Sequence, residues 1–130
     1  MIFNPNKAIY LQIAEHVCEQ IVLEKWPSEV KIPSVRDLAI QLEVNPNTVM
    51  RTYDLLQQKG IINNKRGIGF FVAAEAITQV KRYRKALFMQ DELPQLFRNV
   101  YLLDIDFDEL KTLYKEFVDL NFNPKCDEKK

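Results

Sequence analysis

Three polar residues with hydrogen-bonding side chains lie close together in the sequence, at Asn47, Thr48 and Arg51. Helical spacing would place them on one face, opposite Val49 and Tyr53, whose side chains suit a core. Asparagine and arginine carry the donors and acceptors that match the edges of adenine and guanine. A threonine hydroxyl and the free N–H groups of a helix's first turn suit phosphate oxygens. The same residues would also make an ordinary solvated helix face, and both interpretations stay open here.

Arg36 is a second residue whose position could do chemistry. Ser34 suits an N-cap and Asp37 can complete a capping box, so Arg36 falls in the first turn of a helix. The helix dipole disfavours a cation there by about 0.3–1 kcal/mol. A phosphate partner would offset that cost, and the alternative is an arginine paired with Asp37 or with another acid.

The apolar spacing predicts three helices that would position these residues. The first covers about residues 7–25 and ends at Pro27. The second begins after Ser34 and continues for about ten residues. A turn of two residues then precedes the third helix, for which Asn45 is the expected N-cap and Gly60 the terminating glycine. Two helices joined by so short a turn predict a helix-turn-helix, whose second helix lies in the major groove of DNA.

A β-hairpin is expected directly after the third helix. Residues 61–65 and 68–72 have the pattern of two short strands joined by a turn at Arg66 and Gly67. Gly67 can adopt the positive φ of such a turn, and Arg66 at the tip could enter a minor groove or meet its phosphates. A charged hairpin tip can equally serve solubility alone. The hairpin completes a winged helix-turn-helix over about residues 7–73.

The remainder of the chain is helical in pattern, and we expect a helical region over residues 74–122 and a disordered tail over residues 123–130. Helices are expected over about residues 75–90, from Pro94 and from Asp106. Their apolar side chains exceed what short helices bury alone, which predicts a two-fold dimer. Packing onto the protomer's own first domain is the alternative. We assign the dimer contact to Leu96, Phe97, Val100, Leu110, Leu113, Tyr114 and Phe117.

These elements define a mainly α fold class with a small β-hairpin. The chain of 130 residues has a formal net charge of zero, which at first argues against nucleic acid as a partner. Counted by segment, however, the charge is −2 over residues 1–58, +6 over residues 59–85 and −4 over residues 86–130. The basic stretch covers the wing and the helix after it. Either the DNA backbone or solvent could face the run formed by Lys81, Arg82, Arg84 and Lys85.

Other function classes find little support in the sequence. No apolar run approaches the roughly 18–20 residues of a membrane span, and no export signal is visible. Two distant cysteines, Cys18 and Cys126, fit a reducing cytoplasm. His16 and Cys18 point to different faces of a helix, which makes a poor metal or catalytic pair. We therefore expect a cytoplasmic protein with no catalytic residues, no metal and no cofactor.

Four segments in one uninterrupted order resemble the N-terminal domain of the GntR family of bacterial transcription regulators. They read IYLQIA, IPSVRDLA, VNPNTV and RGIGFFV, within about residues 9–73. About 55 residues follow, and this shortness, with Leu93-Pro94-Gln95-Leu96-Phe97, resembles the YtrA-type subfamily, whose small helical tail serves dimerisation. That subfamily often controls neighbouring ABC-transporter genes. The resemblance implies DNA contacts from Arg36, Asn45, Asn47, Thr48, Arg51, Arg66 and Gly67.

Four positions depart from the family pattern. Met50 occupies a position that is commonly basic, so the base preference of the third helix stays open. Ser28-Glu29 stands where a Pro-Gly turn is usual, and Glu43 replaces the common glycine between the two helices. A non-glycine residue in a left-handed turn costs about 1–2 kcal/mol.

Together these observations predict a homodimeric, sequence-specific DNA-binding transcription regulator that acts as a repressor on a palindromic operator. The sequence does not identify an effector. The alternative is a winged-helix adaptor that binds protein through its C-terminal helices and does not bind DNA. Arg36, Arg51 and Arg66 acting together would distinguish the two.

Overall fold

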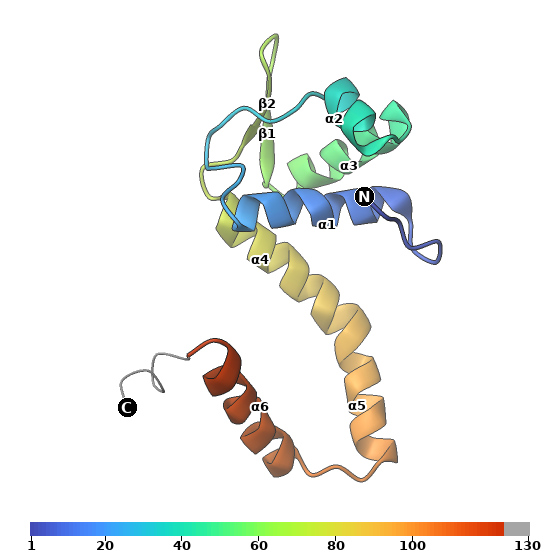
Figure 1. Cartoon of the computed structure of the whole chain (residues 1–130), viewed down its shortest axis with the longest axis vertical. Helices are drawn as coiled ribbons and strands as arrows, with labels where there is room; N and C mark the ends of the chain where they lie inside the picture. Colours follow the sequence, from blue (N-terminus) through green and yellow to red (C-terminus); the bar gives the residue numbers. More distant parts are fainter. Residues whose placement is uncertain (124–130) are drawn as a thin grey trace. The chain divides into compact units, whose positions relative to one another are not determined.

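The computed structural model describes residues 1–123 of the chain, which are mainly helical with one antiparallel hairpin (Figure 1). The fold class expected from the sequence is thereby confirmed. The chain forms two compact units, and the second begins at Ala86. No helix among the described residues is long and apolar enough to span a membrane. In chain order the elements are α1 (Ile9–Val22), α2 (Val35–Leu42), α3 (Pro46–Gln58), β1 (Ile62–Lys65), β2 (Gly69–Val72), α4 (Ala76–Leu87), the π-helical segment η1 (Phe88–Glu92), α5 (Leu93–Leu102) and α6 (Phe107–Asn121).

The core of the first unit forms where α1, α2 and α3 bury their apolar faces. Ile13 and Val17 of α1 and Val49 and Leu56 of α3 are fully buried, and Leu38 of α2 is 1% exposed. These residues recur at helical spacing, so each helix directs one stripe into the core. The face of α3 that carries Asn47 and Arg51 is left to solvent.

Local capping signals fix where α2 and α3 begin. The Ser34 hydroxyl accepts a hydrogen bond from the Asp37 N–H at 3.0 Å, and the Asn45 side chain accepts one from the Asn47 N–H at 2.8 Å. Both N-caps are confirmed. The reciprocal bond of a capping box, in which the Ser34 N–H would donate to the Asp37 carboxylate, is absent among the described residues. Glu43 ends α2 in the left-handed conformation, with φ 56° and ψ 48°.

The first helix is shorter than its apolar pattern predicts, because α1 ends at Val22 and not near residue 25. Glu24 takes a positive φ of 58°. The chain then folds back, and the N–H groups of Lys25 and Trp26 both donate to the Gln20 carbonyl. These bonds satisfy a carbonyl of the last turn.

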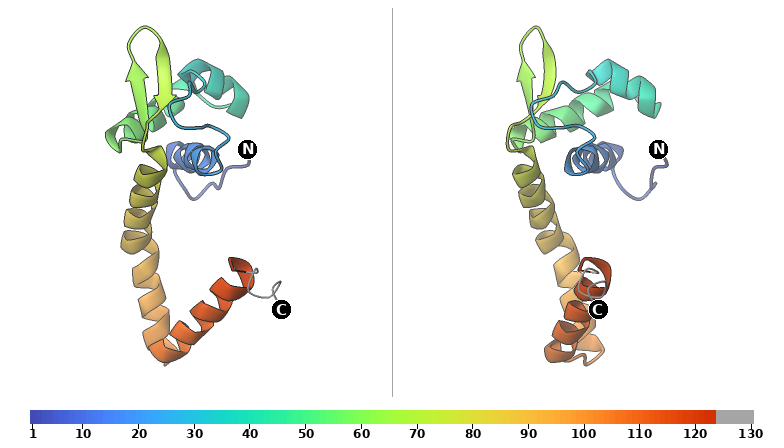
Figure 2. Two further views of the ribbon diagram at one scale, coloured as in Figure 1. Left: turned by 90° about the vertical axis from the view of Figure 1, so that its left-hand side faces the viewer. Right: turned by 60° about the vertical axis from the view of Figure 1, so that its left-hand side comes forward.

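The wing consists of β1 and β2, paired antiparallel from Ile62 opposite Val72 to Lys65 opposite Gly69. A third segment lies along the other edge of β2, since the Ile32 N–H donates to the Phe70 carbonyl at 2.9 Å. β2 therefore has a hydrogen-bonded neighbour along each of its two edges. Figure 2 shows the hairpin projecting beyond the helices of the same unit.

In the second unit Pro94 lies in the first turn of α5, as the sequence predicts, but the preceding helical path does not stop before it. Glu92 and Leu93 both have right-handed helical dihedrals, so the helical path continues from η1 into α5. Proline lacks an N–H and its ring collides with the carbonyl four residues earlier in an α-helix. The wider π-helical turn just before Pro94 accommodates that collision within a continuous helical path. The start of α6 is as expected, because the Asp106 side chain accepts from the Asp108 N–H at 3.1 Å.

The expected tail over residues 123–130 lies outside the described residues, apart from Asn123, and so does Cys126.

Candidate nucleic-acid interface

The first turns of α3 present a polar face. Asn47 and Arg51 are exposed and Thr48 is half-buried, whereas Val49 and Tyr53 on the other side of the helix are fully buried. The two-sided pattern expected from the sequence is therefore present. Asn45 is also exposed, but its side-chain oxygen is occupied in capping the helix. Its amide group is left to act as a donor.

This face of α3 and the start of α1 together line one hollow. Ala8, Ile9 and Tyr10 contribute one side, and Asn47, Thr48 and Arg51 contribute the other. The Arg51 guanidinium carbon lies 3.9 Å from the centroid of the Tyr10 ring. Sequence reasoning missed Tyr10 as a site residue, because its place in the apolar repeat of α1 assigned it to the core.

A hydrogen bond fixes the Tyr10 backbone relative to α3. The Thr52 hydroxyl, fully buried, donates to the Tyr10 backbone carbonyl at 2.7 Å. Since Thr52 follows Arg51 directly, this bond sets the register between the arginine and the ring on which it stacks.

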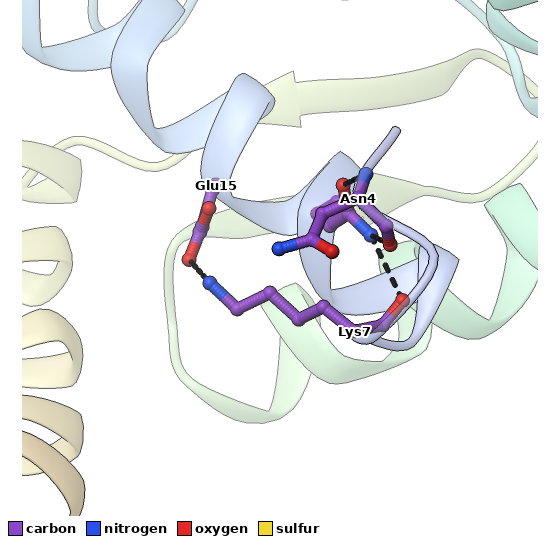
Figure 3. Close-up of polar contacts among 4 residues, drawn as sticks. Asn4, Lys7 and Glu15 are labelled. Atoms are coloured by element: carbon purple, nitrogen blue, oxygen red, sulfur yellow. Dashed lines mark hydrogen bonds and ion pairs between the residues drawn. The ribbon is translucent and has the colours of Figure 1, made fainter. Parts of the chain in front are cut away.

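The N-terminal arm is bound to α1 by a second group of polar contacts (Figure 3). The Gln12 amide accepts from the Asn4 N–H at 2.7 Å and donates to the carbonyls of Asn4 and Lys7, at 2.7 and 2.8 Å. An ion pair at 2.6 Å joins Lys7 to Glu15. These contacts fix the chain immediately before the rim of the hollow, and explain why Gln12, though polar, is 7% exposed.

Arg36 lies exposed in the first turn of α2. Within residues 1–123 the one ion pair closer than 4.0 Å is that of Lys7 with Glu15, so Arg36 does not pair with Asp37. The acid partner that would explain Arg36 structurally is thus missing from the described part of the chain. An exposed cation beside the N–H groups of a helix start is suited to an anionic partner.

The wing carries further cations besides Arg66 at its tip. Arg66 is exposed at the turn, and the Lys65 ammonium lies 4.2 Å from the Phe71 ring centroid. The side chain of Lys31 crosses Gly69, since a Cβ on that glycine would lie 3.0 Å from the lysine Cε. Sequence reasoning missed Lys31, because the segment count placed it in an acidic part of the chain. The pairing of Lys31 with Phe71 across the edge of β2 brings it to the wing.

Residues 1–123 contain no group of three or more His, Cys, Asp or Glu side chains placed to hold a metal. Cys18 is fully buried, and burial raises the pKa of its thiol to about 11, which leaves it protonated and unreactive. Partial burial lowers the pKa of His16.

The side chains assigned to a dimer contact differ in exposure within one protomer. Leu113 is 52% exposed and Phe117 is 57% exposed, on the apolar face of α6. Leu110 is half-buried, and Val100 is only 7% exposed. Val100 therefore already packs inside its own unit. The others leave an apolar surface on the second unit, formed by Leu96, Phe97, Leu113, Tyr114 and Phe117.

Comparison with known proteins gives consistent results. The sequence profile described as "Bacterial regulatory proteins, gntR family" matches residues 9–72. The HTH-type transcriptional regulator YhcF of Bacillus subtilis is 43% identical over 81 residues, covering 61% of this chain and 67% of YhcF. The HTH-type transcriptional repressor YtrA of the same organism is 32% identical over 108 residues, covering 83% of this chain and 82% of YtrA. A crystal structure of a GntR-family transcriptional regulator from Bacteroides thetaiotaomicron has a TM-score of 0.76 at 46% identity, covering 86% of this chain and 97% of that one.

Proposed function

Because the chain belongs to the GntR family of bacterial transcription regulators and carries its DNA-binding helix-turn-helix, we propose that it is a homodimeric repressor that binds a palindromic operator. The observation that supports sequence-specific binding most directly is the hollow between α1 and α3. There Asn47, Thr48 and Arg51 stand together, and no acid pairs with the arginine among the described residues.

The remaining contacts would position the protein on the duplex. We assign phosphate contacts to Arg36 and to the wing cations, because exposed arginines and lysines neutralise phosphates without reading sequence. Gly67 would let the wing backbone approach the DNA closely. Asn45, Asn47, Thr48 and Arg51 would face the major groove from α3.

Dimerisation is proposed from the apolar surface of the second unit. Its members Leu113 and Phe117 are more than half exposed in one protomer, although large apolar side chains are usually covered. Two-fold pairing would place two α3 helices against two half-sites about one turn of DNA apart.

Repression then follows from occlusion of a promoter. Genes of a neighbouring transporter are proposed as targets on the resemblance to YtrA-type regulators alone, and the cytoplasm as the place of action.

Selection from a library of random DNA duplexes tests this function, because the protein itself then chooses the operator. We expect enrichment of an inverted repeat whose half-site centres are about 10 base pairs, or a multiple of that, apart. On the enriched duplex, Arg51→Ala should weaken binding by about 1–3 kcal/mol. Lys115→Ala, which removes an exposed cation from α6, is the matched control and should bind as the unaltered protein does. A library without any enriched duplex would favour the adaptor function.

Sedimentation at micromolar concentration tests the dimer. The unaltered chain should sediment as a dimer, and the double variant Leu113→Lys, Phe117→Lys as a monomer with unchanged helical circular dichroism. A stable monomer for the unaltered chain contradicts the proposal.

Transcription in vitro from a promoter that overlaps the selected repeat should fall as protein is added, whereas a rise would identify an activator.

A further inference from the structure

The stack of Arg51 on Tyr10 leaves the hydrogen-bonding edge of the arginine unoccupied. The guanidinium carbon is 3.9 Å from the ring centroid, so the contact uses the face of the guanidinium plane. The five N–H donors of arginine lie in that plane. None of them has a protein acceptor among the hydrogen bonds and ion pairs of residues 1–123. The side chain is thus held by its face and free at its edge.

Hydrogen bonds hold the backbone at Tyr10 in place, which allows its ring to orient Arg51. Its backbone carbonyl accepts the 2.7 Å bond from the buried Thr52 hydroxyl, which couples it to the turn of α3 that carries Arg51. On its other side, Gln12 binds the carbonyls of Asn4 and Lys7 and so fixes the arm that leads into α1 (Figure 3). These bonds fix the backbone that carries the Tyr10 ring and the arm that precedes it.

An oriented guanidinium with a free edge matches one base in particular. Guanine presents O6 and N7 as two adjacent acceptors in the major groove, and arginine pairs with both at once. A side chain already held in one orientation loses less freedom on forming that pair. Phosphate would accept the same donors, but it is the same in every sequence and would give no base preference.

We infer that Tyr10 is a positioning residue that holds Arg51 for bidentate contact with a guanine in each half-site of the operator. This inference rests on the proposed function, because it requires that α3 enters the major groove. Tyr10 needs no contact with DNA for this role. It acts through the arginine, and its aromatic face is the group required.

The test replaces each guanine of the selected half-site in turn by 7-deazaguanine, which lacks the N7 acceptor. One replacement should weaken binding of the unaltered protein at least about fivefold. The affinity of the Arg51→Ala variant should not change with that replacement. Tyr10→Leu, which keeps apolar bulk without an aromatic face, should lose most of the discrimination, and Tyr10→Phe should retain it.

Two further measurements separate a positioning role from a structural one. Tyr10→Leu should bind a duplex of unrelated sequence within about twofold of the unaltered protein, and its melting temperature should match that of Tyr10→Phe within a few degrees. The double variant Tyr10→Leu, Arg51→Ala should bind the operator no more weakly than Arg51→Ala alone, because Tyr10 acts only through the arginine.

The possible failures are distinguishable. If the unaltered protein selects no duplex, the proposed function fails. If it binds a selected operator but no 7-deazaguanine weakens it, or Tyr10→Leu discriminates as well as the unaltered protein, only this inference is overturned. Equal loss of affinity by Tyr10→Leu for the operator and for the unrelated duplex would make Tyr10 a structural residue and would likewise overturn it.

Discussion

The hydroxyl of Tyr53, in α3, donates a 2.7 Å hydrogen bond to the backbone carbonyl of Pro33, the residue before the N-cap of α2. The same ring meets Phe70 of β2 edge-on, with centroids 4.8 Å apart. One fully buried side chain thereby connects the proposed recognition helix with the start of α2 and with the wing. Burial raises the pKa of the Tyr53 hydroxyl above its ordinary value of 10.0, so it remains a donor in alkaline solution as well.

Replacing Tyr53 by Phe should lower the free energy of unfolding by about 0.5–1.5 kcal/mol, because the variant loses the hydrogen bond and keeps the packed ring. Urea unfolding followed by circular dichroism measures the change. Tyr101→Phe removes a hydroxyl from a side chain that is 81% exposed, and its midpoint should not move. Equal midpoints for both variants would show that the bond to Pro33 contributes nothing to stability.

Glu43 has a left-handed backbone conformation, and the sequence already indicated its cost in folding free energy. It ends α2 with φ 56°, a conformation that costs a residue with a side chain about 1–2 kcal/mol. Glycine adopts it freely but loses more freedom on folding, so Glu43→Gly should raise the free energy of unfolding by about 1 kcal/mol. Gln41→Gly, two residues earlier inside α2, should lower it by about 1 kcal/mol. Two variants that shift the urea midpoint in the same direction would contradict this account.

The features predicted well from the sequence are those with local causes. Ser34 and Asn45 cap helices through bonds to N–H groups two or three residues away, and their types suffice to identify them. Glu43 stands in a left-handed turn that the length of the connection requires. The wing follows likewise from two short segments with the pattern of strands and a turn at Gly67.

The features missed depend on contacts between distant segments. Tyr10 and Arg51 meet because α1 and α3 pack together, and neither residue indicates the other in the sequence. Lys31 joins the wing through pairing with β2. Pro94 marks the first turn of α5 correctly, but no local signal shows that the helical path continues into it from η1.

Gly69 and Gly67 should respond differently to the same substitution. Gly67 has φ +79° and open space where a side chain would stand, which asparagine tolerates. Gly69 has φ +136°, and a Cβ there would also lie 3.0 Å from Lys31 Cε. Gly69→Asn should therefore lower the free energy of unfolding by about 1–3 kcal/mol, and Gly67→Asn by less than about 1 kcal/mol. Thermal melts of the two variants side by side decide the point, and the reverse order would refute the strain at Gly69.

Arg36 should lower the stability of the folded protein and raise its affinity for DNA. It places a positive charge at the positive end of α2 without an acid partner among residues 1–123, so Arg36→Ala should raise the free energy of unfolding by about 0.3–1 kcal/mol. The same variant should bind every duplex more weakly, with the slope of log affinity against log salt reduced by about 1. Arg36→Lys keeps the charge and should retain the slope. Filter-binding titrations across a salt series provide the readout, and an unchanged slope for Arg36→Ala would exclude a phosphate contact.

The buried thiol of Cys18 makes stability depend on pH on the alkaline side. Burial raises its pKa from the ordinary value of 9.0 to about 11, so the unfolded chain releases this proton first. The contribution is complete below pH 9 and is lost as pH rises toward 11, by at most about 1.4 kcal/mol per pH unit. Tyr53 and Tyr83, whose pKa values are also raised by burial from 10.0, add the same trend above pH 10.

Urea unfolding between pH 8 and pH 10 isolates the thiol. In a Cys126→Ser background, so that Cys18 is the one thiol of the chain, the free energy of unfolding should fall between pH 9 and pH 10. Cys18→Ala in the same background should start from lower stability, because a buried sulfur is removed, but should show a flatter dependence over that interval. The slope is the quantity compared. Parallel pH curves for the two proteins would mean that the thiol ionises equally in the folded and unfolded states.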